Sequence, residues 1–85
     1  MEEEFNKIVD IVNNNKNNTE LGITTTNMVD LYKFYKQATI GDCNIPEPSF
    51  IYFEAKTKWS AWNSIKGMSK EEAMKKYCDV YHSIV

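Results

Sequence analysis

A chain of 85 residues is long enough for one domain with a modest hydrophobic core, so we expect a single domain over residues 1–85. Its net charge of −2 provides no general attraction to nucleic acid, and the lack of an apolar run of about twenty residues argues against a membrane-spanning helix. With only three glycines and two prolines, the composition favours long helices over a β fold with many turns.

The first predicted helix lies at the N-terminus, where Glu2–Glu4 interact favourably with the dipole of its first turn. The polar run Asn13–Asn18 follows and is predicted to be a loop, because it has low helix propensity and nothing to bury. Between the acidic first turn and this polar run, Phe5, Ile8, Val9 and Val12 follow the spacing of an amphipathic helix.

A second helix is predicted to run to about Thr39. The segment Thr24–Asn27 offers N-cap side chains, and Gly41 suits the left-handed position that often ends a helix. Its apolar stripe consists of Met28, Leu31, Tyr35 and Ala38, with Val29, Tyr32 and Lys36 beside it.

Two further helices complete the predicted fold. After an extended loop with two prolines, a third helix is expected from about Ile51 to Lys66, with Gly67 just beyond it. Ser69 and Glu72 match the capping box of a fourth helix. The third helix carries Ala55, Trp59 and Trp62 on one face, and the fourth carries Met74, Tyr77, Cys78, Tyr81 and Val85. The prediction is an all-α fold of four helices without a strand.

The segment YKFYK, residues 32–36, is the best candidate for a binding site. On a helix, Tyr32 and Lys36 share a face, and Tyr35 lies next to Lys36. Flat rings beside ammonium groups suit a nucleotide, and phosphates would meet point charges, because all ten basic residues are lysines. By periodicity alone, tyrosines packed in the core beside a solvated lysine are the commoner arrangement.

Three segments resemble the acyl-CoA-binding protein family, small helical carriers of long-chain fatty acyl-CoA thioesters. YKQATIGDCN is similar to the family signature YKQAT-G-N, and KTKWSAWN is similar to KAKWDAWN. The resemblance covers essentially the whole chain and is strongest from Leu31 to about Asp79. It implies a four-helix bundle of the acyl-CoA-binding protein type, a single acyl-CoA-binding domain, and a monomer without catalysis, cofactor or metal. The three segments are Leu31–Cys43, Lys56–Asn63 and Ser69–Tyr77.

The resemblance also implies roles for the head-group residues. It implies that Tyr35 stacks near adenine and that Tyr32 and Lys36 meet the phosphates. It implies that Lys58 binds a phosphate of CoA and that Trp59 borders the ligand; otherwise Lys58 is an ordinary exposed lysine. Tyr77 is implied to reach the phosphate-bearing ribose, and a buried tyrosine joining the first and fourth helices is the alternative.

An acyl chain requires an apolar path. Met28 and Val29 match the family positions that line this path, and Val9 of the first helix is expected to face the same region. Plain core packing is the alternative for all three. The family often carries a basic residue late in the first helix, for which Lys16 is the nearest candidate here.

The predicted function is a carrier that binds medium- to long-chain fatty acyl-CoA reversibly and delivers it to enzymes or membranes by transient contact. One rival is a helical protein-interaction module that has lost the ligand. Another is a thioesterase-like enzyme using Cys78 and His82, which are four residues apart; a buried cysteine is favoured over this nucleophile.

The expected location is the cytoplasm. The N-terminal MEEEFNK is acidic and shows no secretory or mitochondrial targeting pattern. Cys43 and Cys78 alone make a poor disulfide framework, which favours a reducing compartment.

Overall fold

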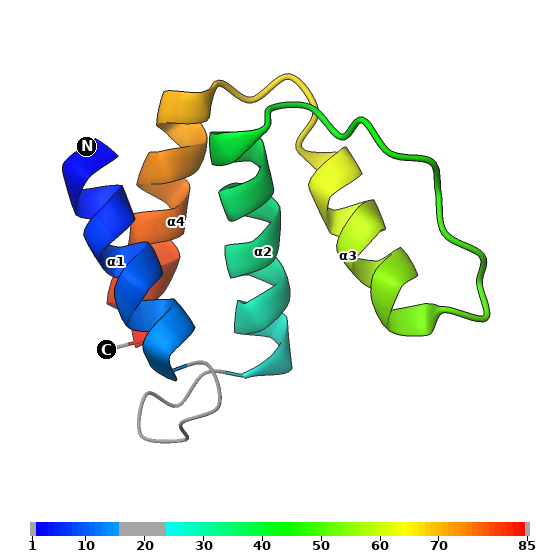
Figure 1. Cartoon of the computed structure of the whole chain (residues 1–85), viewed down its shortest axis with the longest axis horizontal. Helices are drawn as coiled ribbons and strands as arrows, with labels where there is room; N and C mark the ends of the chain where they lie inside the picture. Colours follow the sequence, from blue (N-terminus) through cyan, green and yellow to red (C-terminus); the bar gives the residue numbers. More distant parts are fainter. Residues whose placement is uncertain (1, 16–23, 85) are drawn as a thin grey trace.

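The computed structural model describes residues 2–15 and 24–84, with only the backbone of Asn15 described. This part of the chain forms four helices and no strand, as predicted: α1 (Glu2–Asn15), α2 (Thr25–Thr39), α3 (Phe53–Ser64) and α4 (Lys70–Ile84). The helix α2 packs against both α4 and α3, and α1 packs against α4 (Figure 1). None of the four is both long enough and apolar enough to cross a bilayer.

The ends of α2 and α4 follow local sequence signals. The Thr24 hydroxyl accepts a hydrogen bond from the Asn27 N–H at 3.1 Å, which confirms the predicted N-cap of α2. Gly41 has a φ of 106°, and its N–H donates to the Lys36 carbonyl, so the predicted left-handed end is also confirmed. At the start of α4, the Ser69 hydroxyl accepts from the Glu72 N–H at 3.1 Å.

The helix α3 is shorter than its predicted range of Ile51 to Lys66. A turn closed by the Tyr52 N–H and the Ser49 carbonyl precedes it, so regular helix begins only at Phe53. At its other end the Ile65 N–H donates to the Trp62 carbonyl three residues back, which tightens the chain and ends the α-helix at Ser64. Of the three residues predicted to share one face of this helix, Trp62 is buried, Trp59 is half-buried and Ala55 is exposed.

The hydrophobic core lies between α1, α2 and α4. The predicted stripes of these helices are confirmed in that Phe5, Leu31 and Tyr77 are each 3% exposed or less. The predicted stripe residue Val85 lies outside the described residues. The buried members of the core are Phe5, Ile8, Val12, Leu31, Ala38, Ala73, Tyr77 and Cys78.

A group of polar contacts, here called the Asp42 junction, joins the end of α2 to the segment between α3 and α4. It consists of Gln37, Asp42, Gly67 and Met68. The buried Gln37 amide donates to an Asp42 carboxylate oxygen at 2.9 Å and to the Met68 carbonyl at 2.8 Å. The Gly67 N–H donates to the same carboxylate oxygen at 2.8 Å. Nearby, the buried Trp62 indole donates to the Gly41 carbonyl at 2.8 Å, which fixes α3 to the same corner.

The Asp42 junction gives the stability a specific pH dependence. The hydrogen bonds from Gly67 and Gln37 lower the pKa of Asp42 below its ordinary value of 3.8. The stabilisation is therefore complete above that ordinary value, and it is lost as the pH falls through the lower pKa of the folded state.

We expect Asp42→Asn to lower the melting temperature at neutral pH, because the amide keeps an acceptor but loses the charge. The difference from the wild type should shrink as the pH falls below about 4, where the wild-type carboxylate also becomes protonated. Thermal unfolding followed by circular dichroism from neutral to acidic pH measures this. Asp10→Asn, on the exposed side of α1, is the matched control. A difference that stays constant with pH would contradict the assigned role of Asp42.

Candidate functional site

A groove of about 730 Å³ lies along α2, with the start of α3 as its other wall. Its volume is within the usual range for small-molecule sites, which is about 300–1,000 Å³. The wall from α2 consists of Thr25, Met28, Val29, Leu31, Tyr32, Tyr35 and Lys36. The remaining wall consists of Val12 and Asn13 of α1, Phe53, Glu54, Thr57 and Lys58 of α3, and Tyr77 of α4.

Most of the predicted site residues meet in this groove: Met28, Val29, Tyr32, Tyr35, Lys36, Lys58 and Tyr77. Val9 and Trp59 are not among its lining residues. Val9 is half-buried and packs against the hydrophobic core. Trp59 lines a neighbouring hollow together with Tyr32 and Lys58, and its indole N–H donates to the Ile45 carbonyl at 2.9 Å.

Two ammonium groups flank the ring of Tyr32. The Nζ of Lys36 lies 5.8 Å from the ring centroid, and that of Lys58 lies 5.4 Å from it. Lys58 also pairs with the exposed Glu54 carboxylate at 3.4 Å. Within residues 2–15 and 24–84 no carboxylate pairs with Lys36, whose ammonium also lies 5.7 Å from the Trp62 ring. This end of the groove can therefore attract an anion.

An aromatic group of Phe5, Tyr35 and Tyr77 reaches the groove through Tyr35 and Tyr77. The buried rings of Phe5 and Tyr77 meet edge to face at 5.1 Å, and Tyr35 lies 6.3 and 6.4 Å from them. Tyr35 is 36% exposed, so it is not a core side chain but a ring supported by two buried ones. Tyr35 also lines the groove, so its ring is accessible to a ligand there.

Tyr77 belongs both to the hydrophobic core and to the groove. Its ring contacts Phe5 of α1, which confirms the alternative of a buried tyrosine joining the first and last helices. The same residue lines the groove, so the two roles are compatible. Burial is the main cause that raises the pKa of its hydroxyl, which keeps the proton available for donation to an acceptor.

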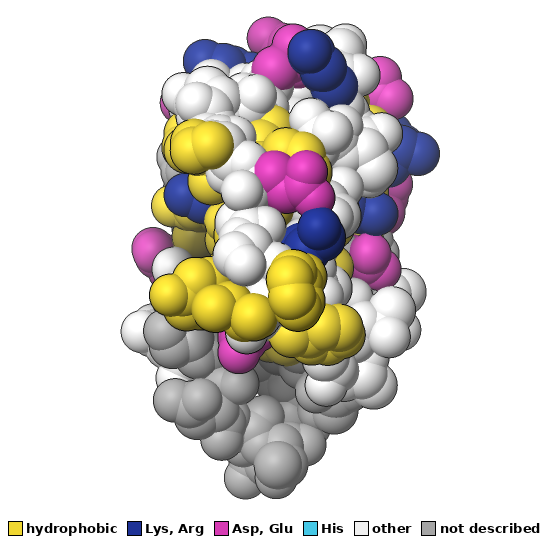
Figure 2. Space-filling view, turned by 90° about the vertical axis from the view of Figure 1, so that its right-hand side faces the viewer, with side chains coloured by type: hydrophobic (Ala, Val, Ile, Leu, Met, Phe, Trp, Pro, Cys, Tyr) yellow, Lys and Arg dark blue, Asp and Glu magenta, His cyan; other side chains and the backbone are white. Residues whose placement is uncertain are grey.

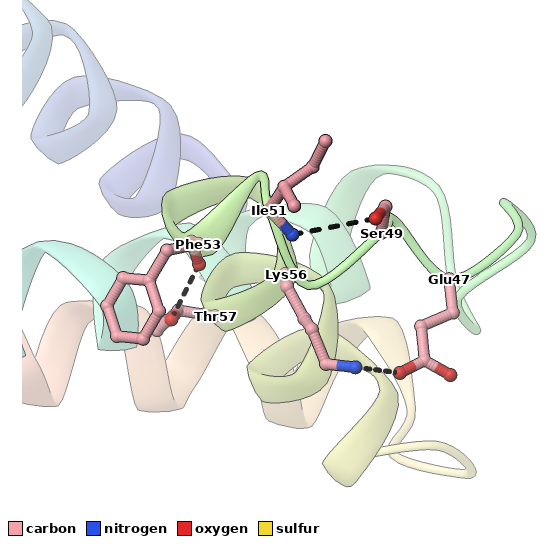
Figure 3. Close-up of polar contacts among 6 residues, drawn as sticks. All are labelled: Glu47, Ser49, Ile51, Phe53, Lys56 and Thr57. Atoms are coloured by element: carbon pink, nitrogen blue, oxygen red, sulfur yellow. Dashed lines mark hydrogen bonds and ion pairs between the residues drawn. The ribbon is translucent and has the colours of Figure 1, made fainter.

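Towards the start of α2 the groove is lined by the apolar side chains of Met28 and Val29, with Thr25 beyond them. The opposite wall includes Phe53 and Thr57, which were not predicted from the sequence as site residues. The Thr57 hydroxyl donates to the Phe53 carbonyl at 2.9 Å, so it needs no polar partner from the groove (Figure 3). The apolar run Phe50–Phe53 just before α3 was the available signal for this wall.

The arrangement of Cys78 and His82 does not support a nucleophile and its base. Cys78 is 2% exposed, and burial, followed by the carboxylate of Glu4, raises the pKa of its thiol. The His82 imidazole lies 3.6 Å from the Glu4 carboxylate on the exposed side, and neither Cys78 nor His82 lines the groove. Lys16 lies outside the described residues, as do residues 17 and 18 of the predicted Asn-rich loop. The loop prediction is wrong for Asn13–Asn15, which form the last turn of α1.

Comparison with known proteins gives a consistent result. The family model described as "Acyl CoA binding protein" matches residues 2–81. The "Acyl-CoA-binding protein" of Dictyostelium discoideum is 51% identical over 57 residues, which are 67% of this chain and 68% of that protein. The "Acyl-CoA-binding domain-containing protein 5A" of Danio rerio is 44% identical over 92% of this chain, which spans only 16% of that longer protein.

Solved structures agree with the sequence relatives. The crystal structure of ACBP from Moniliophthora perniciosa superposes with a TM-score of 0.95 at 38% identity, over 99% of this chain and 79% of that one. The crystal structure of Oryza sativa Acyl-CoA-Binding Protein 2 gives a TM-score of 0.82 at 32% identity, over 98% of this chain and 88% of that one. The helices, the predicted motifs and these similarities lead to one conclusion: the chain belongs to the acyl-CoA-binding protein family.

Proposed function

We propose that this chain binds medium- to long-chain fatty acyl-CoA esters reversibly and carries them without changing them chemically. The main support is a single groove that has two lysines and several aromatic rings at one end and apolar side chains at the other. An acyl-CoA ester is amphipathic in the same order, with a charged nucleotide at one end and a hydrocarbon chain at the other.

The proposed head-group site uses residues from three helices. Tyr35 stacks on adenine, and Tyr32, Lys36 and Lys58 bind the phosphates as point charges. Tyr77 donates its hydroxyl to the phosphate-bearing ribose. The most direct support is the ammonium of Lys36, which pairs with no carboxylate of the described residues.

The proposed acyl site is the apolar end of the groove. Each methylene buried against Met28, Val29 and Phe53 contributes about 0.8 kcal/mol, a gain that does not depend on salt. Trp59 borders the ligand from the neighbouring hollow. Val9 has an indirect part, because it packs against the core behind the α1 wall.

The proposal also covers the oligomeric state, the cellular location and the acceptors of the ligand. We propose a monomer that acts in the cytoplasm and delivers the thioester to acyl-CoA-using enzymes or to membranes. Two free cysteines support a reducing compartment, and the buried thiol of Cys78 supports a carrier over a thioesterase.

Calorimetry with palmitoyl-CoA, free CoA and palmitate tests the joint site. We expect tight binding of palmitoyl-CoA, weak binding of CoA and almost none of palmitate, because only the thioester fills both ends of the groove. Equal affinities for palmitate and palmitoyl-CoA would refute the head-group site. Failure of the helical protein to bind palmitoyl-CoA would instead indicate an interaction module that has lost the ligand.

The salt dependence of Lys36→Ala tests the phosphate contact. At low ionic strength we expect the affinity for palmitoyl-CoA to fall about tenfold, because one ammonium–phosphate contact is lost. The difference should narrow as salt screens the wild-type contact. Lys33→Ala is the matched control, since Lys33 is on the same helix, pairs with Asp30 and does not line the groove. A loss that is independent of salt would count against a phosphate role for Lys36.

A separate experiment tests whether the protein hydrolyses the thioester. Palmitoyl-CoA incubated with the wild type and with Cys78→Ala should be hydrolysed at the same slow rate in both samples. Thiol release and mass spectrometry measure this rate. If the wild type releases free CoA rapidly and Cys78→Ala does not, the protein is a thioesterase and the carrier proposal is wrong.

A further inference from the structure

Among residues 2–14 and 24–84, the most exposed large apolar side chains lie just before α3 and at its first residue. Four consecutive residues, here called the apolar rim, are Phe50, Ile51, Tyr52 and Phe53, and they are 77%, 67%, 63% and 80% exposed. Figure 2 shows hydrophobic side chains gathered on this side of the molecule, below a more polar area. Such a group of large side chains on a soluble protein marks an interaction surface.

From this surface we infer that the apolar rim docks the protein on the interface of a net-neutral phospholipid bilayer. These exposed side chains lie at the start of α3, which packs chiefly on α2 and begins at the outer edge of the molecule (Figure 1), so they can enter a fluid surface without a shaped partner. Aromatic side chains, including a tyrosine with its polar hydroxyl, suit the boundary between headgroups and acyl chains.

The charges beside the apolar rim favour neutral lipid over anionic lipid. Lys56 pairs with Glu47 at 2.6 Å (Figure 3), and Lys58 pairs with Glu54 at 3.4 Å, so both lysines near the rim are matched by carboxylates. The net charge of the chain is −2, which is repelled by an anionic surface. Zwitterionic headgroups complement this balance, because they require no excess of either charge.

The backbone of the apolar rim is also suited to a medium with little water. The Tyr52 N–H donates to the Ser49 carbonyl at 3.0 Å, and the Ile51 N–H donates to the Ser49 hydroxyl at 3.5 Å. The Phe53 carbonyl accepts from the Thr57 hydroxyl (Figure 3). These bonds reduce the cost of moving the turn out of water.

The docking surface is continuous with the groove, since Phe53 belongs to both. The purpose of docking rests on the proposed function: an acyl chain that passes between bilayer and groove would stay against apolar side chains throughout. The docking itself can be measured without any acyl-CoA.

The test compares the wild type with the double variant Phe50→Ser and Ile51→Ser, neither of which lines the groove. Sedimentation with phosphatidylcholine vesicles should give wild-type binding that is insensitive to salt and a loss of about tenfold or more in the variant. Ile40→Ser is the matched control, because Ile40 is 45% exposed at the opposite end of α2 and should retain wild-type binding.

Three results would overturn the inference. One is equal vesicle binding by the wild type and the double variant. Another is binding that requires phosphatidylserine and disappears in high salt. The third is a wild-type dimer in analytical ultracentrifugation that the double variant abolishes, which would identify a second copy as the occupant.

Failure of the proposed function is distinguishable from these results. Calorimetry with water-soluble octanoyl-CoA should give equal affinities for the wild type and the double variant. If neither binds octanoyl-CoA or palmitoyl-CoA but the wild type alone binds vesicles, the carrier proposal fails and the docking surface stands.

Discussion

One carboxylate oxygen of Asp42 accepts hydrogen bonds from the Gln37 amide and the Gly67 N–H, and the position of α3 depends on this contact. The hydrophobic core is built from α1, α2 and α4, whereas α3 is fixed mainly through Trp62 and the Asp42 junction. Since α3 supplies one wall of the groove, the shape of the candidate site depends on a few polar atoms at a distance from it.

The helix α2 determines the order of chemistry along the groove. Met28, Tyr32 and Lys36 follow one another at intervals of four residues, so they lie on one face about 12 Å long. The face changes from apolar to aromatic to cationic along that distance. Placing the lysine in the last turn also puts its charge near the negative end of the helix dipole.

Local patterns were sufficient to predict the number and order of the helices from the sequence, because caps and apolar spacing act within a few residues. Thr24, Gly41 and Ser69 are examples, and the groove residues Tyr32, Tyr35, Lys36 and Lys58 were found through motifs. The Asp42 junction joins residues far apart in the chain, so no local pattern predicts it. The exposure of Phe53 was not predicted, because an apolar run in the sequence does not reveal whether other residues cover it. The length of α3 was overestimated, because its start depends on the turn from Ser49 to Tyr52.

The ammonium of Lys36 lies 5.7 Å from the ring of Trp62, which is 1% exposed and shielded from solvent. A charge this close to an indole ring changes the energy of the excited state of the ring. The attraction between the ammonium and the ring also depends on the distance between them. The colour and intensity of the light that Trp62 emits therefore depend on where the Lys36 side chain is. The fluorescence of Trp62 therefore reports on the cationic end of the groove without an attached dye.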